Sequence, residues 1–114
     1  MKKWFTGNGN EISFDQILDI IKEHSLEEGT VYIGSDSMLN KGKCVFCTAI
    51  CLLGDTKQSN QYFIRRTKND AKEFKTLLQR ITMEVQNSID MGLRLLELCP
   101  TIKIELHLDV SQPD

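Results

Sequence analysis

The chain has 114 residues, of which 40% are hydrophobic and 26% are charged, and this composition is typical of one folded domain with a core. No segment reaches the roughly 18 consecutive apolar residues of a membrane-spanning helix. The N-terminal segment MKKWFTGNGNE also lacks the apolar run of a secretion signal. We therefore expect a single cytoplasmic domain over residues 1–114, with its four cysteines reduced.

The net charge of −2 conceals a basic middle segment. Residues 1–40 carry 3 basic and 7 acidic side chains, residues 41–80 carry 9 and 3, and residues 81–114 carry 2 and 6. If the basic side chains of the middle segment converge, they form a patch that faces phosphates of a nucleic acid. The candidates are Lys41, Lys43, Arg65, Arg66, Lys68 and Lys72. The alternative is that they are ordinary solvated charges on strands and helices.

The first predicted element is a short amphipathic helix at residues 14–24. Its apolar residues, Phe14, Ile17, Leu18 and Ile21, have helical spacing. Ser13 precedes them with a glutamine three positions later, which is the pattern of a capping box.

Three strands are predicted next, at residues 31–37, 44–53 and 61–67. Their sequences, VYIGSDS, CVFCTAICLL and QYFIRRT, are rich in β-forming residues, and the turn-forming segments NKGK and GDTKQSN separate them. Short connections favour an antiparallel meander. Because residues 44–53 are almost continuously apolar, we expect this strand to be central.

A long helix from Asp70 to Leu98 and a strand at residues 102–110 complete the prediction. The helix shows an apolar stripe and ends before Pro100, and the strand alternates strictly between apolar and polar residues. The helical crossover allows this strand to lie parallel to strand 31–37. The sequence reaches Asp114 with no helix to cover one face of the sheet. We expect either a domain that is incomplete at the C-terminus or a cover supplied by another chain.

Two aspartates, Asp36 and Asp109, occur at the ends of strands that we expect to be parallel neighbours. Their carboxylates would emerge at the same end of the sheet, and a divalent cation would relieve their repulsion. For either residue alone, the alternative is a turn former. Glu84 borders the apolar stripe of the long helix, where it can lean over the sheet or pair with Arg80. His107, on the polar face of the last strand, is an auxiliary candidate for proton transfer or phosphate contact, or a hydrogen-bonding histidine.

These segments together resemble a known family. Trp4-Phe5 with the first helix, YIGSDS, CTAI, LLQRITMEVQNSI and IELHLDV are similar, in this order, to the YkuK-type family of small bacterial and phage ribonuclease H-like proteins. The resemblance covers most of the chain. It implies an α/β fold with a mixed sheet, in which a three-strand antiparallel meander leads through a long crossover helix to a fourth strand parallel to the first. The same resemblance leads us to expect an extra N-terminal helix before this arrangement and a fold that is truncated after the fourth strand.

The same resemblance implies a metal site. In ribonuclease H-like proteins, carboxylates in the first strand, the helix and the fourth strand, with a fourth acidic or histidine ligand, hold two Mg²⁺ or Mn²⁺ ions. Asp36, Glu84 and Asp109 match the first three ligands, and the fourth is missing from this sequence. The leading hypothesis is a metal-dependent nuclease that hydrolyses DNA or RNA phosphodiesters by a two-metal mechanism. The alternatives are a non-catalytic nucleic-acid-binding module that uses segment 41–80, and an assembly protein whose homo-oligomer covers the exposed sheet face.

Overall fold

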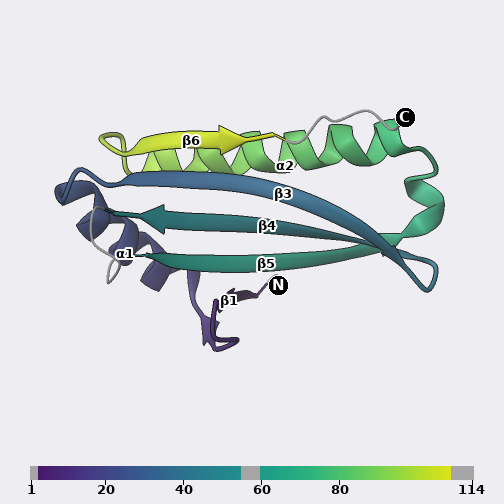
Figure 1. Cartoon of the computed structure of the whole chain (residues 1–114), viewed down its shortest axis with the longest axis horizontal. Coiled ribbons are helices and arrows are strands. Elements are labelled where there is room, and N and C mark those ends of the chain that lie inside the picture. Colours follow the sequence, from purple (N-terminus) through teal and green to yellow (C-terminus); the bar gives the residue numbers. More distant parts are fainter. Residues whose placement is uncertain (1–2, 55–59, 109–114) are drawn as a thin grey trace.

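The computed structural model describes residues 3–54 and 60–108, whose strands form one mixed sheet (Figure 1). The strands are β1 (Trp4–Thr6), β2 (Glu11–Ile12), β3 (Thr30–Asn40), β4 (Lys43–Leu53), β5 (Gln61–Asp70) and β6 (Lys103–His107). Their order across the sheet is β2-β1-β5-β4-β3-β6. Strands β3, β4 and β5 pair antiparallel in succession, and β6 lies parallel to β3. The mixed α/β fold expected from the sequence is confirmed.

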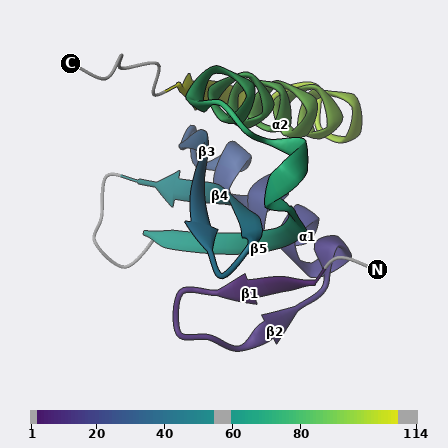
Figure 2. The ribbon, with the colours of Figure 1, turned by 90° about the vertical axis from the view of Figure 1, so that its right-hand side faces the viewer.

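Both long helices, α1 (Phe14–Leu26) and α2 (Leu77–Leu98), lie on the same face of this sheet (Figure 2). Helix α1 begins with the predicted capping box, because the Ser13 hydroxyl accepts from the Gln16 amide while the Gln16 side chain accepts from the Ser13 amide. The face away from the helices is here called the open face. No helix among the described residues covers it.

The prediction that the long helix starts at Asp70 is wrong. Strand β5 continues to Asp70, a short 3-10 helix, η2 (Ala71–Glu73), follows, and α2 begins only at Leu77. Thr76 and Gln79 form a second capping box at this start. The apolar pattern misled the prediction because residues before Thr76 continue it without being helical.

The N-terminal hairpin, β1 and β2, was not predicted. Strand β1 pairs with β5, and Trp4 lies opposite Arg65 in the register. At only three and two residues these strands are too short for a periodic signal. The hairpin widens the sheet and places the Trp4 ring, 4% exposed, in the core.

The core lies between the sheet and the two helices. Alternate residues of the central strand β4 enter it: Cys44, Phe46, Thr48, Ile50 and Leu52 are all buried. Helix α1 contributes Ile17 and Ile21, and α2 contributes Met91 and Leu95. The intervening residues of β4 lie on the open face and are half-buried.

Helix α2 buries its predicted apolar stripe only in part. The stripe consists of Phe74, Leu77, Leu78, Ile81, Val85, Ile89, Gly92 and Leu96. Gly92 is buried, but Leu78 and Leu96 are 73% and 40% exposed. Glu84 and Ser88 are instead buried. Gly92 allows a close approach, since a Cβ at this position would lie 3.2 Å from the Cδ2 atom of Leu106 on β6.

None of the helices in the described part of the chain is long and apolar enough to cross a membrane. All four cysteines are free, as expected.

Candidate functional site

Strand alternation places Asp36 and Glu84 on different sides of the sheet. The hydroxyl of Ser37, the next residue of β3, donates a hydrogen bond to the Oε2 atom of Glu84 on the helix-covered side. Asp36 therefore lies on the open face, where its side chain is exposed. Its Oδ1 atom accepts the Ser37 backbone N–H at 2.8 Å. The two carboxylates that the sequence assigns to one site thus lie on opposite sides of β3.

Glu84 belongs to a cluster of polar side chains buried beneath α2. Besides the Ser37–Glu84 bond, the Ser88 hydroxyl donates to the Ser35 hydroxyl at 3.0 Å, and Ser35 and Thr48 share a hydrogen bond of 3.2 Å. We call these residues the hydroxyl cluster. Ser88 is 1% exposed and Thr48 is 3% exposed, so their hydrogen bonds replace bonds to water. Because hydroxyls on β3 and β4 face α2 here, the helix presents polar residues to the sheet at this level.

On the open face, Asp36 forms one end of a row across three strands. Its partner in the register is Cys47 of β4, and the partner of Cys47 on β5 is Arg66. Burial raises the pKa of the Cys47 thiol, the positive Arg66 opposes this increase, and the negative Asp36 adds to it. The thiol is therefore close enough to both charged groups to respond to each of them.

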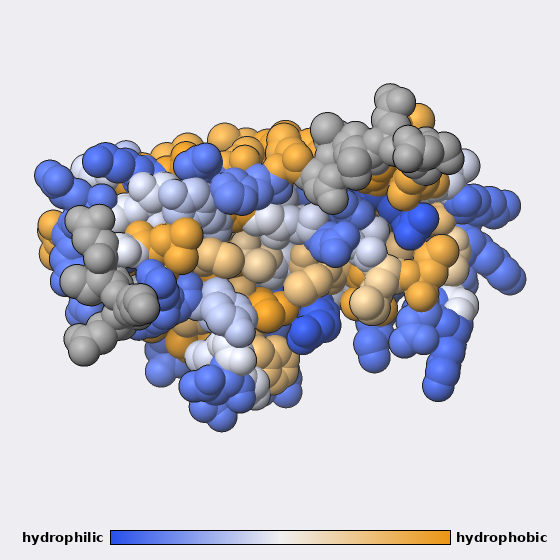
Figure 3. Space-filling view, in the orientation of Figure 1, coloured by the Kyte–Doolittle hydropathy of each residue, from blue (hydrophilic) through white to orange (hydrophobic). Residues whose placement is uncertain are grey.

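The six candidate basic residues do not form a single patch. Lys43, Arg66 and Lys68 occupy open-face positions of β4 and β5, since they alternate in register with Cys47. Lys41 is in the β3–β4 turn with a positive φ of 49°, and Lys72 is in η2. Figure 3, which looks onto the open face, shows hydrophilic side chains projecting at the end of the sheet where β3 turns into β4.

Arg65 is separated from the other basic candidates because it faces the helices. Its guanidinium lies over the Trp4 ring, 5.0 Å from the centroid, and is half-buried. Burial lowers the pKa of Arg65, and the positive charge of Arg94 on α2 lowers it further. Arg65 and Arg66 are adjacent in the sequence, so strand alternation alone sends their charges to opposite faces.

His107 ends β6 on the open face. Its ring packs edge-on against Tyr32 of β3 with a centroid distance of 5.0 Å, and its Nε2 atom lies 3.8 Å from a carboxylate oxygen of Glu105. In the register, His107 is the partner of Gly34. A Cβ at Gly34 would lie 3.9 Å from the His107 Cβ, so the glycine leaves the space beside the histidine open.

Asp109 lies outside the described residues. Among the residues that are described, no group of three or more histidine, cysteine, aspartate or glutamate side chains is arranged to hold a metal ion. The three-carboxylate site made of Asp36, Glu84 and Asp109 therefore stays a prediction.

Sequence reasoning missed the hydroxyl cluster and the pairing of Tyr32 with His107. A signal for the cluster was present. Ser35 and Ser37 are two apart on a strand, and Glu84 and Ser88 are four apart on a helix, so each pair shares a face of its own element. Searching for polar residues with the periodicity normally used for apolar ones would have found both halves of the cluster.

Comparison with known proteins identifies the family of the chain. Searches among curated proteins and among solved structures gave no significant match. The family model described as Ribonuclease H-like matches residues 13–113, which include α1, the meander, α2 and β6. This match covers most of the chain and agrees with the resemblance found in the sequence, so the protein belongs to the ribonuclease H-like family.

Proposed function

We propose that this chain acts on nucleic acids and hydrolyses phosphodiester bonds with a divalent ion, Mg²⁺ or Mn²⁺, bound by Asp36 and Asp109. The register of β3 and β6 carries the proposal. Gly34 pairs with His107 in this parallel register, and Asp36 and Asp109 each follow these partners by two positions in the sequence. Asp36 and Asp109 are thus separated by as many positions in the sequence as the paired residues Gly34 and His107. Two ligands of one metal site on neighbouring parallel strands need this equal separation.

The chemistry of Asp36 suits a hard cation. Its carboxylate is exposed on the open face, and carboxylate oxygens are the ligands that Mg²⁺ prefers. Among the described residues no group of carboxylates completes a metal site, so Asp109 is the second ligand that the proposal requires. Glu84, which the family resemblance implies as a third ligand, is held by Ser37 on the other side of the strand.

The substrate class follows from the family and from the charges on the open face. Lys43, Arg66 and Lys68 share this face with Asp36, and lysine and arginine supply the phosphate contacts of nucleic-acid-binding proteins. Tyr32 and His107 form an aromatic pair on the same face. A nucleic-acid strand bound there would bring its phosphates near Asp36.

The first experiment measures metal binding by the rise in thermal midpoint during titration with Mn²⁺. At a hundredfold excess over Kd, a bound ion adds about 2.7 kcal/mol, which moves the midpoint of a domain of this size by several degrees. We expect the rise in the wild type and in the control Asp19→Asn on α1, and its loss in both Asp36→Asn and Asp109→Asn. Equal rises in all four proteins would refute the shared site.

The second experiment measures cleavage of labelled single-stranded and duplex DNA and RNA in Mn²⁺. We expect the wild type to cleave at least one substrate, and Asp36→Asn and Asp109→Asn to lose that cleavage while Asp19→Asn keeps it. Cleavage by the two variants at the wild-type rate would contradict the catalytic assignment.

The shared face of Lys43, Arg66 and Lys68 favours a second candidate, a module that binds nucleic acids without cleaving them. It predicts binding in EDTA that weakens steeply with salt and weakens further in Arg66→Gln and Lys68→Gln. Lys22→Gln, on the outer side of α1, serves as the charge-matched control. Equal effects of all three variants would show that the open face does not carry the binding.

A further inference from the structure

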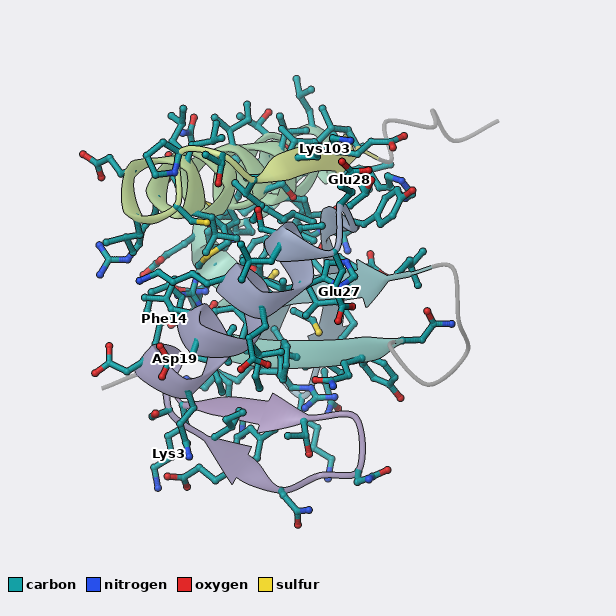
Figure 4. The ribbon with its side chains drawn as sticks, turned by 90° about the vertical axis from the view of Figure 1, so that its left-hand side faces the viewer. Lys3, Phe14, Asp19, Glu27, Glu28 and Lys103 are labelled. Carbon is teal, nitrogen blue, oxygen red and sulfur yellow. The ribbon has the colours of Figure 1, made fainter. Side chains whose placement is uncertain are left out.

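A groove on the helix-covered side is unrelated to the proposed metal site. It has a volume of about 510 Å³ and lies where the β1–β2 hairpin meets the beginning of α1 and the middle of α2. Figure 4 shows Lys3 on the hairpin side and Phe14 at the start of α1. The groove is lined by Lys3, Trp4, Glu11, Ile12, Ser13, Phe14, Arg65, Met91 and Arg94. Its volume is within the range of small-molecule sites, about 300–1,000 Å³.

Two guanidinium groups border this groove, each stacked on an aromatic ring. Arg65 lies 5.0 Å from the centroid of the Trp4 ring, and Arg94 lies 5.3 Å from the centroid of the Phe14 ring. The two rings are themselves neighbours, with centroids 6.1 Å apart. Four elements, β1, α1, β5 and α2, thus combine a cationic rim with an aromatic wall.

The positive charge of this rim is not neutralised by the protein. Lys3 forms an ion pair with Glu11 at 3.4 Å, but within the described ranges neither Arg65 nor Arg94 forms an ion pair. The Nε atom of Arg65 is also buried without a hydrogen-bond partner. A buried donor of a charged group that lacks a partner is costly, so the charge of Arg65 is poorly compensated by the protein.

The proximity of the two arginines adds to this cost. Burial lowers the pKa of Arg65 and the charge of Arg94 lowers it further, because each disfavours the protonated guanidinium. A bound carboxylate or phosphate would offset this lowering of the pKa, since it supplies the opposite charge and accepts guanidinium hydrogen bonds.

We propose that this groove binds a small organic anion, with a carboxylate or phosphate held between Arg65 and Arg94 and an apolar body against the aromatic wall. A planar guanidinium group can donate two parallel hydrogen bonds to two oxygen atoms of either a carboxylate or a phosphate. The competing explanation is that both arginines only shield aromatic rings from water, in which case anions have no preferred position there.

The test uses isothermal titration calorimetry of the whole chain with phenyl phosphate, benzoate and inorganic phosphate. Trp4 is the single tryptophan of the chain, so its fluorescence locates the binding event. We expect phenyl phosphate or benzoate to bind saturably and to change Trp4 emission, and benzyl alcohol, a neutral analogue, to bind at least about tenfold more weakly. A preference between the two aromatic anions identifies the head group, and inorganic phosphate tests whether the apolar body contributes.

Arg94→Gln is the main variant because Arg94 is exposed and its replacement does not disturb the core. We expect it to raise the Kd about tenfold, as the loss of one charged hydrogen bond does. Lys22→Gln removes the same charge from the exposed side of α1, outside the groove, and should change the Kd less than twofold. Arg65→Gln should match Arg94→Gln. Equal effects of Arg94→Gln and Lys22→Gln, binding of benzyl alcohol as tight as that of the anions, or no saturable heat with either aromatic anion would overturn the proposal.

Discussion

The two faces of the sheet are built from alternating residues of the same strands, yet they differ in nearly every physical property. The helix-covered face buries Ile33, Ile50 and Phe63, whereas the open face carries Asp36 and Arg66 over half-buried small residues. Because neighbours in the chain go to opposite faces, one strand contributes one set of residues to the core and the alternate set to the open face. Substitutions one position apart in β3, β4 or β5 should therefore differ in their effect on the free energy of unfolding.

The largest expected effect comes from truncating one isoleucine on each face. Ile50→Ala, at a fully buried position, should lower the free energy of unfolding by about 2–5 kcal/mol, because it removes methyl groups and leaves a cavity. Ile64→Ala, half-buried on the open face, should cost about 1 kcal/mol. Urea unfolding measures both. Equal losses would mean that the open face is covered in solution, which is the assembly hypothesis; if Ile50→Ala does not fold, Ile50→Val replaces it.

The hydroxyl cluster allows a buried hydroxyl of α2 to be compared with an exposed hydroxyl of the same helix. Ser88→Ala should cost about 1 kcal/mol, since it removes the donor to Ser35 at a buried position and regains only part through the higher helix propensity of alanine. Thr82→Ala, on the exposed side of the same helix, removes a hydroxyl that bonds the Leu78 carbonyl and should be neutral or slightly stabilising. The difference between the two unfolding free energies is the test. If Thr82→Ala costs as much as Ser88→Ala, burial of the cluster is not its source of stability.

The cysteines on both faces should make the free energy of unfolding depend on pH. Burial raises the pKa of Cys44 on the covered face and of Cys47 and Cys51 on the open face above the ordinary value of 9.0. The unfolded chain therefore loses these thiol protons first, so the free energy of unfolding should fall as the pH rises through 9 toward the folded-state pKa values. Urea midpoints at pH 8, 9 and 10 measure the decline. In the double variant Cys47→Ala with Cys51→Ala, the urea midpoint should decline less steeply with pH. An unchanged slope would show that the open-face thiols do not cause the decline.

The smallest effect tests the row formed by Asp36, Cys47 and Arg66. Asp36→Asn should speed alkylation of Cys47 by iodoacetamide at pH 8, and Arg66→Gln should slow it, each by a few-fold, because the first lowers and the second raises the pKa of the thiol. Mass spectrometry of the labelled peptide gives the rates. Arg65→Gln is the control on the opposite face, and a change as large as that of Arg66→Gln would contradict the assignment of faces.

The sequence predicted the mixed α/β class and the location of the main elements because their periodicities are regular. It missed the start of α2 because apolar residues continue before Thr76, although the Thr76–Gln79 capping pair was available as a boundary signal. It placed the apolar stripe of α2 against the sheet because periodicity counts hydrophobic residues and contains no information about what the helix packs against. Here the sheet offers hydroxyls, so Glu84 and Ser88 face it instead.

The candidate site was only partly predictable for the same reason. The ligand types were readable from the carboxylates near strand ends, but which face each one uses depends on the register. Asp36 and Ser37 are adjacent, so strand alternation sends them to different sides, and the contact of Ser37 with Glu84 shows which side each one takes. The groove of Arg65 and Arg94 could not be predicted from the sequence. It forms where a hairpin too short to predict, with the adjoining start of α1, meets the distant elements β5 and α2.

The positions of the first and last strands have a consequence for the order of folding. The meander of β3, β4 and β5 joins neighbours in the sequence, so its loops close at low entropic cost. Strands β1 and β6 must each find partners far along the chain, as Trp4 does with Arg65 and Thr30 does with Lys103. Long-range pairings of this kind form slowly. We therefore expect the meander to form first, and the two edges of the sheet, which complete the groove and the β3–β6 pairing, to assemble last.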